Sequence, residues 1–140
     1  MSWLLRAGAT GLLGSILYPV YKFVIPPLTG EANLSQLKLP FKSSELREDK
    51  ASSRIFKFGR ELGIIVITPQ NEVKAFSALC THLDCTVQYR KDLETIWCAC
   101  HNGQYDLEGR NISGPPPRPL EQYDVHISAE TDEIFVSKKT

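Results

Sequence analysis

The chain has 140 residues, and its 16 Lys and Arg residues balance its 16 Asp and Glu residues, so the formal net charge is zero. This length suits one small domain with room for a tail or an anchor. The balanced charge gives no support for a nucleic-acid partner, which would favour a basic chain. All four cysteines and two of the three histidines lie between positions 80 and 101, which favours a metal site, disulfides or both.

The first 28 residues are far more apolar than the rest, and the segment from Ala7 to Tyr21 carries no charge. A membrane span needs about 20 apolar residues, and the segment approaches this length at Ile25 if Lys22 extends its amine to the interface. A cleaved signal is disfavoured because no A-x-A site follows closely, and a buried helix would show a polar face. We therefore expect one N-terminal transmembrane anchor over residues 1–28.

Residues 29–53 follow Pro26-Pro27 and end in a charged, serine-rich stretch without a sustained hydrophobic period. Such a composition is typical of a solvated linker. We expect a hinge here that lets the following domain move relative to the anchor.

From residue 54 to residue 140, alternating and β-branched segments predict short strands with turns between them, and no segment predicts a helix. We therefore expect an all-β domain, a small antiparallel β-sandwich or barrel. His126 lies in an expected strand and has no ligand-type neighbour in the sequence, so a structural role is favoured. The expected strands are Arg54–Phe58, Leu62–Thr68, Val73–Ser77, Thr86–Tyr89, Thr95–Trp97, Tyr123–Ser128 and Glu133–Val136.

Two short motifs each combine thiols with an imidazole. The first box (residues 80–85) reads C-T-H-L-D-C, and the second box (residues 98–103) reads C-A-C-H-N-G. Two Cys and two His could bind zinc, but zinc sites usually pair Cys with Cys on one loop and His with His on a helix. Here each loop offers both ligand types, a pattern that suits a two-iron cluster better.

The two boxes, twelve residues apart, are followed by Gln104-Tyr105-Asp106 and by the proline loop Gly114-Pro115-Pro116-Pro117. Together these motifs resemble the Rieske iron–sulfur subunit of cytochrome bc-type quinol:cytochrome c oxidoreductases. The resemblance covers the chain from about Arg54 to the end and implies a Rieske-type fold with a cluster-binding subdomain. It also implies one [2Fe–2S] cluster, shielded on one side by the proline loop.

The resemblance implies a role for each residue of the site. Cys80 and Cys98 would bind one iron, and His82 and His101 would bind the other. Cys85 and Cys100 would form a disulfide that ties the two boxes together, and the Tyr105 hydroxyl would bond a ligating sulfur.

The implied function is that of the electron-transfer subunit of a membrane translocase in the respiratory chain. His101, with His82 second, would take a proton from quinol as the electron is accepted, and Leu83 would enter the quinol pocket of cytochrome b. A cytochrome c-type protein would receive the electron. We expect a dimeric multi-subunit complex in the bacterial plasma membrane, with the domain on the periplasmic or outer face, where a disulfide persists.

Two departures from the family pattern predict a low midpoint potential. Asp84 replaces a glycine, and Gly103 replaces a serine whose hydroxyl bonds a bridging sulfur; both changes disfavour the reduced cluster. A low potential suits menaquinol, and Gly103→Ser is expected to raise it. The alternative function is the small Rieske subunit of an arsenite-oxidase-like molybdoenzyme. A retained anchor followed by a flexible linker favours the quinol-oxidising complex over this alternative.

Overall fold

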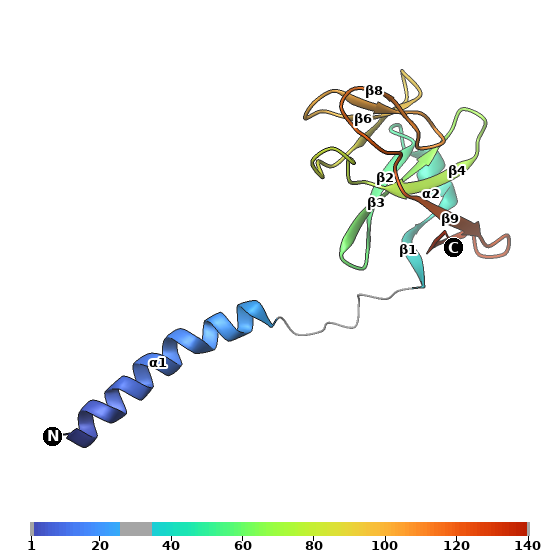
Figure 1. Cartoon of the computed structure of the whole chain (residues 1–140). Helices are drawn as coiled ribbons and strands as arrows, with labels where there is room; N and C mark the ends of the chain where they lie inside the picture. The colour runs from blue at the N-terminus through green and yellow to red at the C-terminus, as the bar shows by residue number, and fades with distance from the viewer. Residues whose placement is uncertain (1, 26–34, 140) are drawn as a thin grey trace. The chain divides into compact units, whose positions relative to one another are not determined.

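The computed structural model describes residues 2–25 and 35–139. The chain divides into two units, residues 1–32 and residues 33–140 (Figure 1). The expected linker starts at residue 29, and residues 26–34 lie outside the described residues. The linker therefore stays a prediction over residues 29–34.

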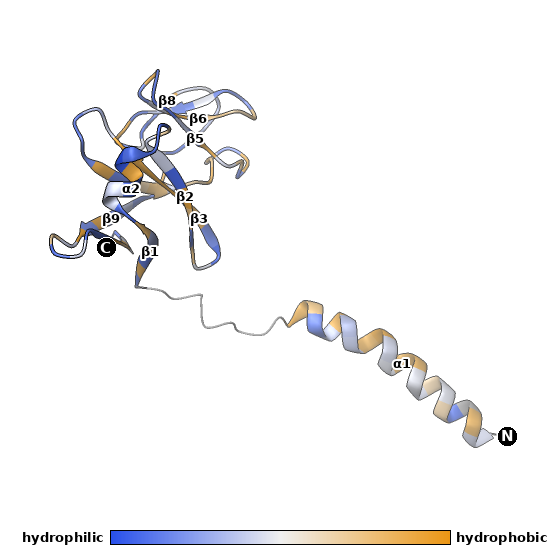
Figure 2. Ribbon diagram, turned by 180° about the vertical axis from the view of Figure 1, so that it is seen from behind, coloured by the Kyte–Doolittle hydropathy of each residue, from blue (hydrophilic) through white to orange (hydrophobic). Residues whose placement is uncertain are grey.

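Helix α1 (Ser2–Val24) forms the described part of the first unit. Figure 2 shows its strongly hydrophobic residues separated by weakly polar ones. Within the described ranges, no helix is both long and apolar enough to cross a membrane. The expected transmembrane span is therefore not confirmed: three glycines, two serines, a threonine and a proline lower the mean hydropathy of a segment that also contains Arg6 and Lys22.

Part of the range expected to be a linker is folded. Strand β1 (Gln36–Lys42) and helix α2 (Ser43–Glu48) belong to the second unit. β1 alternates buried Leu39 and Phe41 with exposed residues, and α2 buries Leu46 completely. Pro40 obscures the alternation in the sequence, but proline is tolerated in a strand at the edge of a sheet, and β1 is such an edge strand.

Six antiparallel strands form the larger sheet, in the order β1-β10-β9-β4-β3-β2. Five of them coincide with expected strands, so this part of the all-β prediction is confirmed. Their bounds are β2 Ser53–Phe58, β3 Glu61–Ile67, β4 Val73–Ser77, β9 Gln122–Ile127 and β10 Glu133–Lys138.

The smaller sheet has four antiparallel strands in the order β5-β6-β7-β8. Figure 1 shows it at the end of the second unit opposite to β1. Its strands are β5 Gln88–Arg90, β6 Thr95–Cys98, β7 Gly103–Tyr105 and β8 Asn111–Ser113. The sequence predicted β5 and β6 but not the three-residue strands β7 and β8, which are too short to show a period.

Strand β3 is buried on both faces and separates two hydrophobic cores. Ile65 and Ile67 face the core formed with β1, α2 and β10, whereas Ile64 and Val66 face the core shared with the smaller sheet. A strand covered on both sides reads as a continuous apolar segment rather than an alternating one. The second core also contains Cys80 and Cys98, so the smaller sheet and both boxes are anchored on β3 and β4.

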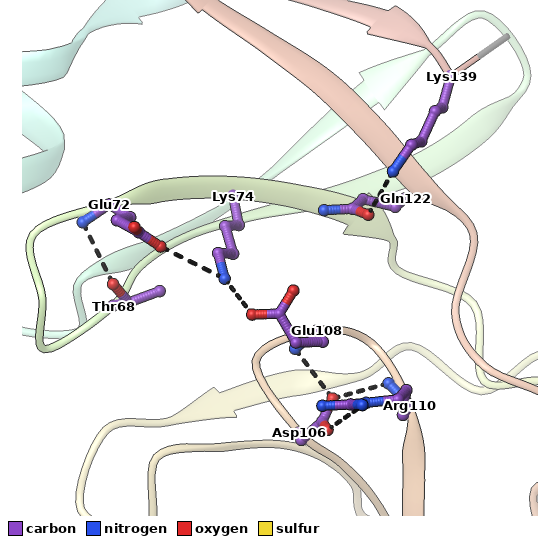
Figure 3. A network of polar contacts seen from close by, with 8 residues as sticks. All are labelled: Thr68, Glu72, Lys74, Asp106, Glu108, Arg110, Gln122 and Lys139. Carbon is purple, nitrogen blue, oxygen red and sulfur yellow. Dashed lines mark hydrogen bonds and ion pairs between the residues drawn. The ribbon is translucent and has the colours of Figure 1, made fainter.

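A polar network also joins the two sheets (Figure 3). Lys74 on β4 pairs with Glu108 in the turn between β7 and β8. Asp106 fixes this turn by accepting hydrogen bonds from the backbone N–H groups of Glu108 (2.9 Å) and Arg110 (2.8 Å), and from Nε of Arg110 (2.9 Å). The turn is therefore held both internally and against the larger sheet.

Candidate metal centre

The first box is a tight loop between β4 and β5. The N–H of Cys80 donates to the carbonyl of Cys85, and the N–H of Asp84 donates to the carbonyl of Cys80, both at 2.9 Å. Asp84 has a φ of +55°, a left-handed conformation that glycine adopts without strain and Asp tolerates. The loop directs Cys80 inward, where it is 2% exposed, and leaves Leu83 65% exposed at its tip.

The second box is the hairpin loop between β6 and β7. Cys98, the last residue of β6, pairs with Gly103, the first residue of β7. Asn102 has a φ of +56°, and its side-chain oxygen accepts a 2.8 Å hydrogen bond from Nε1 of Trp97. This hydrogen bond fixes the second box to β6, the strand that contains Trp97.

The two boxes bring the four side chains that were predicted as ligands together in two pairs. Cys80 and Cys98 are both free thiols buried in the same hydrophobic core, and each affects the pKa of the other. The rings of His82 and His101 meet edge to face, with centroids 4.7 Å apart. His101 is exposed, whereas Nδ1 of His82 is buried and has no hydrogen-bond partner among the described residues.

The predicted disulfide between Cys85 and Cys100 is present and is confirmed. The sulfurs of Cys85, Cys98 and Cys100 lie within 4.8 Å of one another. These three do not form a metal site, because two of them are consumed in the disulfide. The bridge instead covers the side of the Cys98 thiol and ties the first box to the second.

Hydrogen bonds surround the two free sulfurs. Burial alone would raise the pKa of the Cys80 thiol, but the Tyr105 hydroxyl and the backbone N–H groups of His82 and Leu83 lower it overall. Burial raises the pKa of the Cys98 thiol, although backbone N–H groups in its own loop oppose this effect. N–H groups therefore act to stabilise negative charge at both sulfurs, and at Cys80 the Tyr105 hydroxyl adds to them, whereas at Cys98 burial outweighs them.

Tyr105 connects the first box to β7, and it is completely buried. Its oxygen lies 3.4 Å from Sγ of Cys80 and accepts a 3.0 Å hydrogen bond from the N–H of Thr81. The Thr81 hydroxyl lies 3.1 Å from the same oxygen and 2.7 Å from the carbonyl of Arg118, to which it donates. Tyr105 was predicted from the sequence, whereas Thr81, which joins the first box to the segment that follows the proline loop, was not.

The proline loop packs directly against the second box. A Cβ atom added to Gly114, whose φ is +88°, would lie 2.7 Å from Cα of Gly103. A Cβ atom on Gly103 would lie 2.6 Å from Cγ of Pro116. The rise in potential expected for Gly103→Ser stays a prediction, and the structure adds a steric condition, because the ring of Pro116 must shift to admit a side chain at position 103.

Comparison with known proteins agrees with this geometry. The family model described as the Rieske [2Fe-2S] domain matches residues 38–124. The chain belongs to the Rieske family.

Curated relatives and solved structures show the same likeness. The chain is 41% identical over 124 residues to the cytochrome b6-f complex iron-sulfur subunit of Chlorobaculum thiosulfatiphilum, and 35% identical over 123 residues to that of Chlorobaculum tepidum. These matches cover 89% and 88% of this chain but only 65% of either relative. A chain of a solved hyperthermophilic respiratory Complex III is 25% identical, with a TM-score of 0.59 and coverage of 96% of this chain and 98% of that one.

A Rieske domain holds a [2Fe–2S] cluster, and the site has the chemistry that such a cluster requires. Rieske centres replace two of four thiolates by imidazoles on one iron. This chain offers two free thiols buried in one core, and two adjoining imidazoles, one of which has a buried ring nitrogen without a partner. Metal ligation would satisfy that nitrogen, whose burial would otherwise cost free energy.

His126 lies on β9 opposite Phe135, away from both boxes in the sheet, and is exposed. It takes no part in the site. Trp97 and Asn102, which fix the second box, were not predicted as site residues, because nothing in the spacing of the sequence indicates that their side chains meet.

Proposed function

We propose that this Rieske protein is the electron-transfer subunit of a cytochrome bc- or b6f-type quinol:cytochrome c oxidoreductase. The observation that carries this proposal is the unequal exposure of the predicted ligands. Both thiols are buried, whereas His101 is exposed and shares its end of the domain with the exposed Leu83. A partner that docks at this end meets an imidazole and an apolar side chain before it meets either of the two buried thiols.

In this proposal Cys80 and Cys98 bind one iron, and His82 and His101 bind the other. The Tyr105 hydroxyl and the loop N–H groups stabilise the negative charge of the thiolate side. The disulfide holds the two boxes at a fixed separation while the site is exposed to a partner. The support comes from the donor set, its burial and the family to which the chain belongs.

In this proposal, the residues of the chain bind the quinol and accept its proton. Leu83 packs into the apolar wall of the quinol pocket, and the outward ring nitrogen of His101 accepts a hydrogen bond and then the proton of the quinol hydroxyl. His82 is the second candidate for this contact, since its buried Nδ1 would be used by the metal and its other ring nitrogen would remain for the quinol. When bound, the cluster supplies a one-electron acceptor whose potential is raised by its two neutral ligands.

The proposed electron donor is menaquinol. Gly103 offers no hydroxyl to the cluster sulfurs, and Asp84 adds a carboxylate to the first box. Both features disfavour an added electron. A Rieske centre of low potential is matched to a quinol of low potential.

The proposed partners are a cytochrome b subunit, which forms the other wall of the quinol pocket, and a cytochrome c-type acceptor. The names of the curated relatives, which are subunits of cytochrome b6-f complexes, support this assembly. We propose that it is a dimeric complex of the bacterial plasma membrane, acting as a translocase, with the Rieske domain on the periplasmic or outer face. The disulfide supports that side of the membrane, because disulfides persist in oxidising compartments.

Purification of the native complex through a tag on this chain tests the proposal. We expect b-type haem to co-purify and the preparation to reduce a cytochrome c with menaquinol. Co-purification with a molybdenum subunit in the absence of b haem would instead assign the chain to the arsenite-oxidase-like class and overturn the proposal.

A further inference from the structure

A polar cleft lies between the two sheets, outside the metal centre. It has a volume of about 360 Å³. One wall comes from α2 and from the β3–β4 turn with the residues around them, and the other comes from β5 and the β5–β6 turn. The residues of its lining that matter below are Arg47, Ser52, Asn71, Tyr89, Lys91 and Glu94.

Two cations from opposite walls face this cleft, and neither pairs with a carboxylate among the described residues. Nζ of Lys91 donates to Oγ of Ser52 at 2.8 Å. Arg47 donates from Nε to the hydroxyl of Ser43 at 3.3 Å and from its guanidinium to the side-chain oxygen of Asn71. Both cations are thus positioned by neutral oxygens and keep their charge available for an anion.

A buried hydroxyl points to the same place. Tyr89 is only 8% exposed, and its hydroxyl oxygen is buried without a hydrogen-bond partner among the described residues. Burial raises the pKa of Tyr89, and the carboxylate of Glu94 raises it further. The hydroxyl therefore remains a donor, and Tyr89 lines the cleft together with Glu94. Buried polar groups normally have a partner, so this donor marks a position for an acceptor.

We propose that the cleft binds a small oxyanion, a phosphate or carboxylate group, between Arg47, Lys91 and the Tyr89 hydroxyl. The two cations supply charge-assisted hydrogen bonds, and the hydroxyl supplies a neutral one. Because the cations come from the two walls, the bound anion joins the larger sheet to the turn that precedes β6, the strand that ends in the second box. Glu94 at the same cleft opposes binding through its charge. The site is independent of the electron-transfer function proposed above.

The experiment measures anion binding to the full, cluster-loaded chain at constant ionic strength. A ligand that binds the folded protein raises the unfolding temperature in a saturable way. Inorganic phosphate and succinate test free anions, and vesicles of phosphatidylglycerol, compared with phosphatidylcholine, test a lipid headgroup as the source. A saturable rise with a soluble anion supports a site for a free anion, and a response to phosphatidylglycerol alone assigns the same site to a headgroup.

Variants connect the response to the cleft. Lys91→Met and Arg47→Met should each weaken binding by about tenfold, because each removes a hydrogen bond from a charged donor. Glu94→Gln should tighten it. Tyr89→Phe should weaken binding while the free protein becomes more stable, since its unpartnered hydroxyl is gone. Lys139→Met removes one positive charge elsewhere and should leave binding unchanged.

The opposite results overturn the proposal. These are the absence of any saturable response, or a response that the Arg47, Tyr89 and Lys91 variants share with the wild type and with Lys139→Met. The tyrosine variant keeps the test valid if a cation variant fails to fold, because it removes only an oxygen without a hydrogen-bond partner among the described residues.

Discussion

The ring of Pro116 occupies the space beside Gly103 in which a larger residue would place its side chain, since a Cβ atom at position 103 would lie 2.6 Å from Cγ of Pro116. Pro116 is itself buried. The second box and the proline loop are therefore fitted to each other, and a change on one side requires room on the other.

Gly103→Ser alone should disturb this contact. Overpacking a well-packed site costs about 1–3 kcal/mol, so we expect a lower unfolding temperature and less iron per chain. The double variant Gly103→Ser/Pro116→Ala should recover both, and its midpoint potential should exceed that of Pro116→Ala, because a serine hydroxyl can then bond sulfur. Thermal unfolding, iron analysis and redox titration of the three variants measure these effects. Equal stability of Gly103→Ser and wild type would contradict the packing relationship.

Tyr105→Phe should lower the midpoint potential. Burial, followed by the bond to Cys80, raises the pKa of Tyr105, so the hydroxyl stays protonated at neutral pH and can donate to the sulfur 3.4 Å away. A hydrogen bond contributes about 1 kcal/mol, which corresponds to about 40 mV for a one-electron couple. Redox titration of the full chain measures the change.

Tyr123→Phe is the matched control for this prediction, because Tyr123 is also buried but its hydroxyl donates to Glu61 at 3.3 Å. Its potential should equal that of the wild type. A potential of Tyr105→Phe within error of both would show that the hydroxyl does not act on the cluster.

Removal of the disulfide should destabilise the domain. The bridge closes a loop with a sequence separation of 15 residues, for which chain entropy predicts about 3 kcal/mol. The double variant Cys85→Ala/Cys100→Ala should unfold at a lower temperature than the wild type and lose its cluster faster at a fixed temperature. A thiol reductant should destabilise the wild type and leave the variant unchanged; equal effects on both proteins would contradict a stabilising bridge.

The turn between β7 and β8 should make stability depend on acidic pH. Burial acts to raise the pKa of Asp106, but hydrogen bonds from Arg110 and Glu108 lower it below its ordinary value of 3.8. A lowered folded-state pKa stabilises the fold above the ordinary value, and the contribution is lost as pH falls through the lower, folded-state value. The stability difference between wild type and Asp106→Asn should therefore be full at neutral pH and shrink below about pH 4. Denaturant unfolding at several pH values measures this difference, and a constant difference would contradict the assignment.

Short sequence motifs predicted most of the features that depend on residues close together in the sequence. Five strands of the larger sheet, the disulfide, the contact between His82 and His101, and the burial of Cys80 and Cys98 in one core follow from period, spacing and family resemblance. Strand β1 was missed because proline is unfavourable within a strand, although Pro40 occupies an exposed position of the alternation, and because its partner, β10, lies at the other end of the chain. The contacts Gly103–Pro116, Thr81–Tyr105 and Trp97–Asn102 depend on side-chain positions that only the folded chain defines, so no pattern in the sequence could indicate them.

Histidine-specific ¹⁵N labelling with pulsed EPR of the reduced full chain, combined with iron and zinc analysis, tests the proposed coordination most directly. We predict two irons per chain and magnetic coupling to two imidazole nitrogens, with one coupling lost in His82→Cys and one in His101→Cys. Zinc in place of iron, or a spectrum with no ¹⁵N coupling, would contradict the assignment of both histidines as ligands.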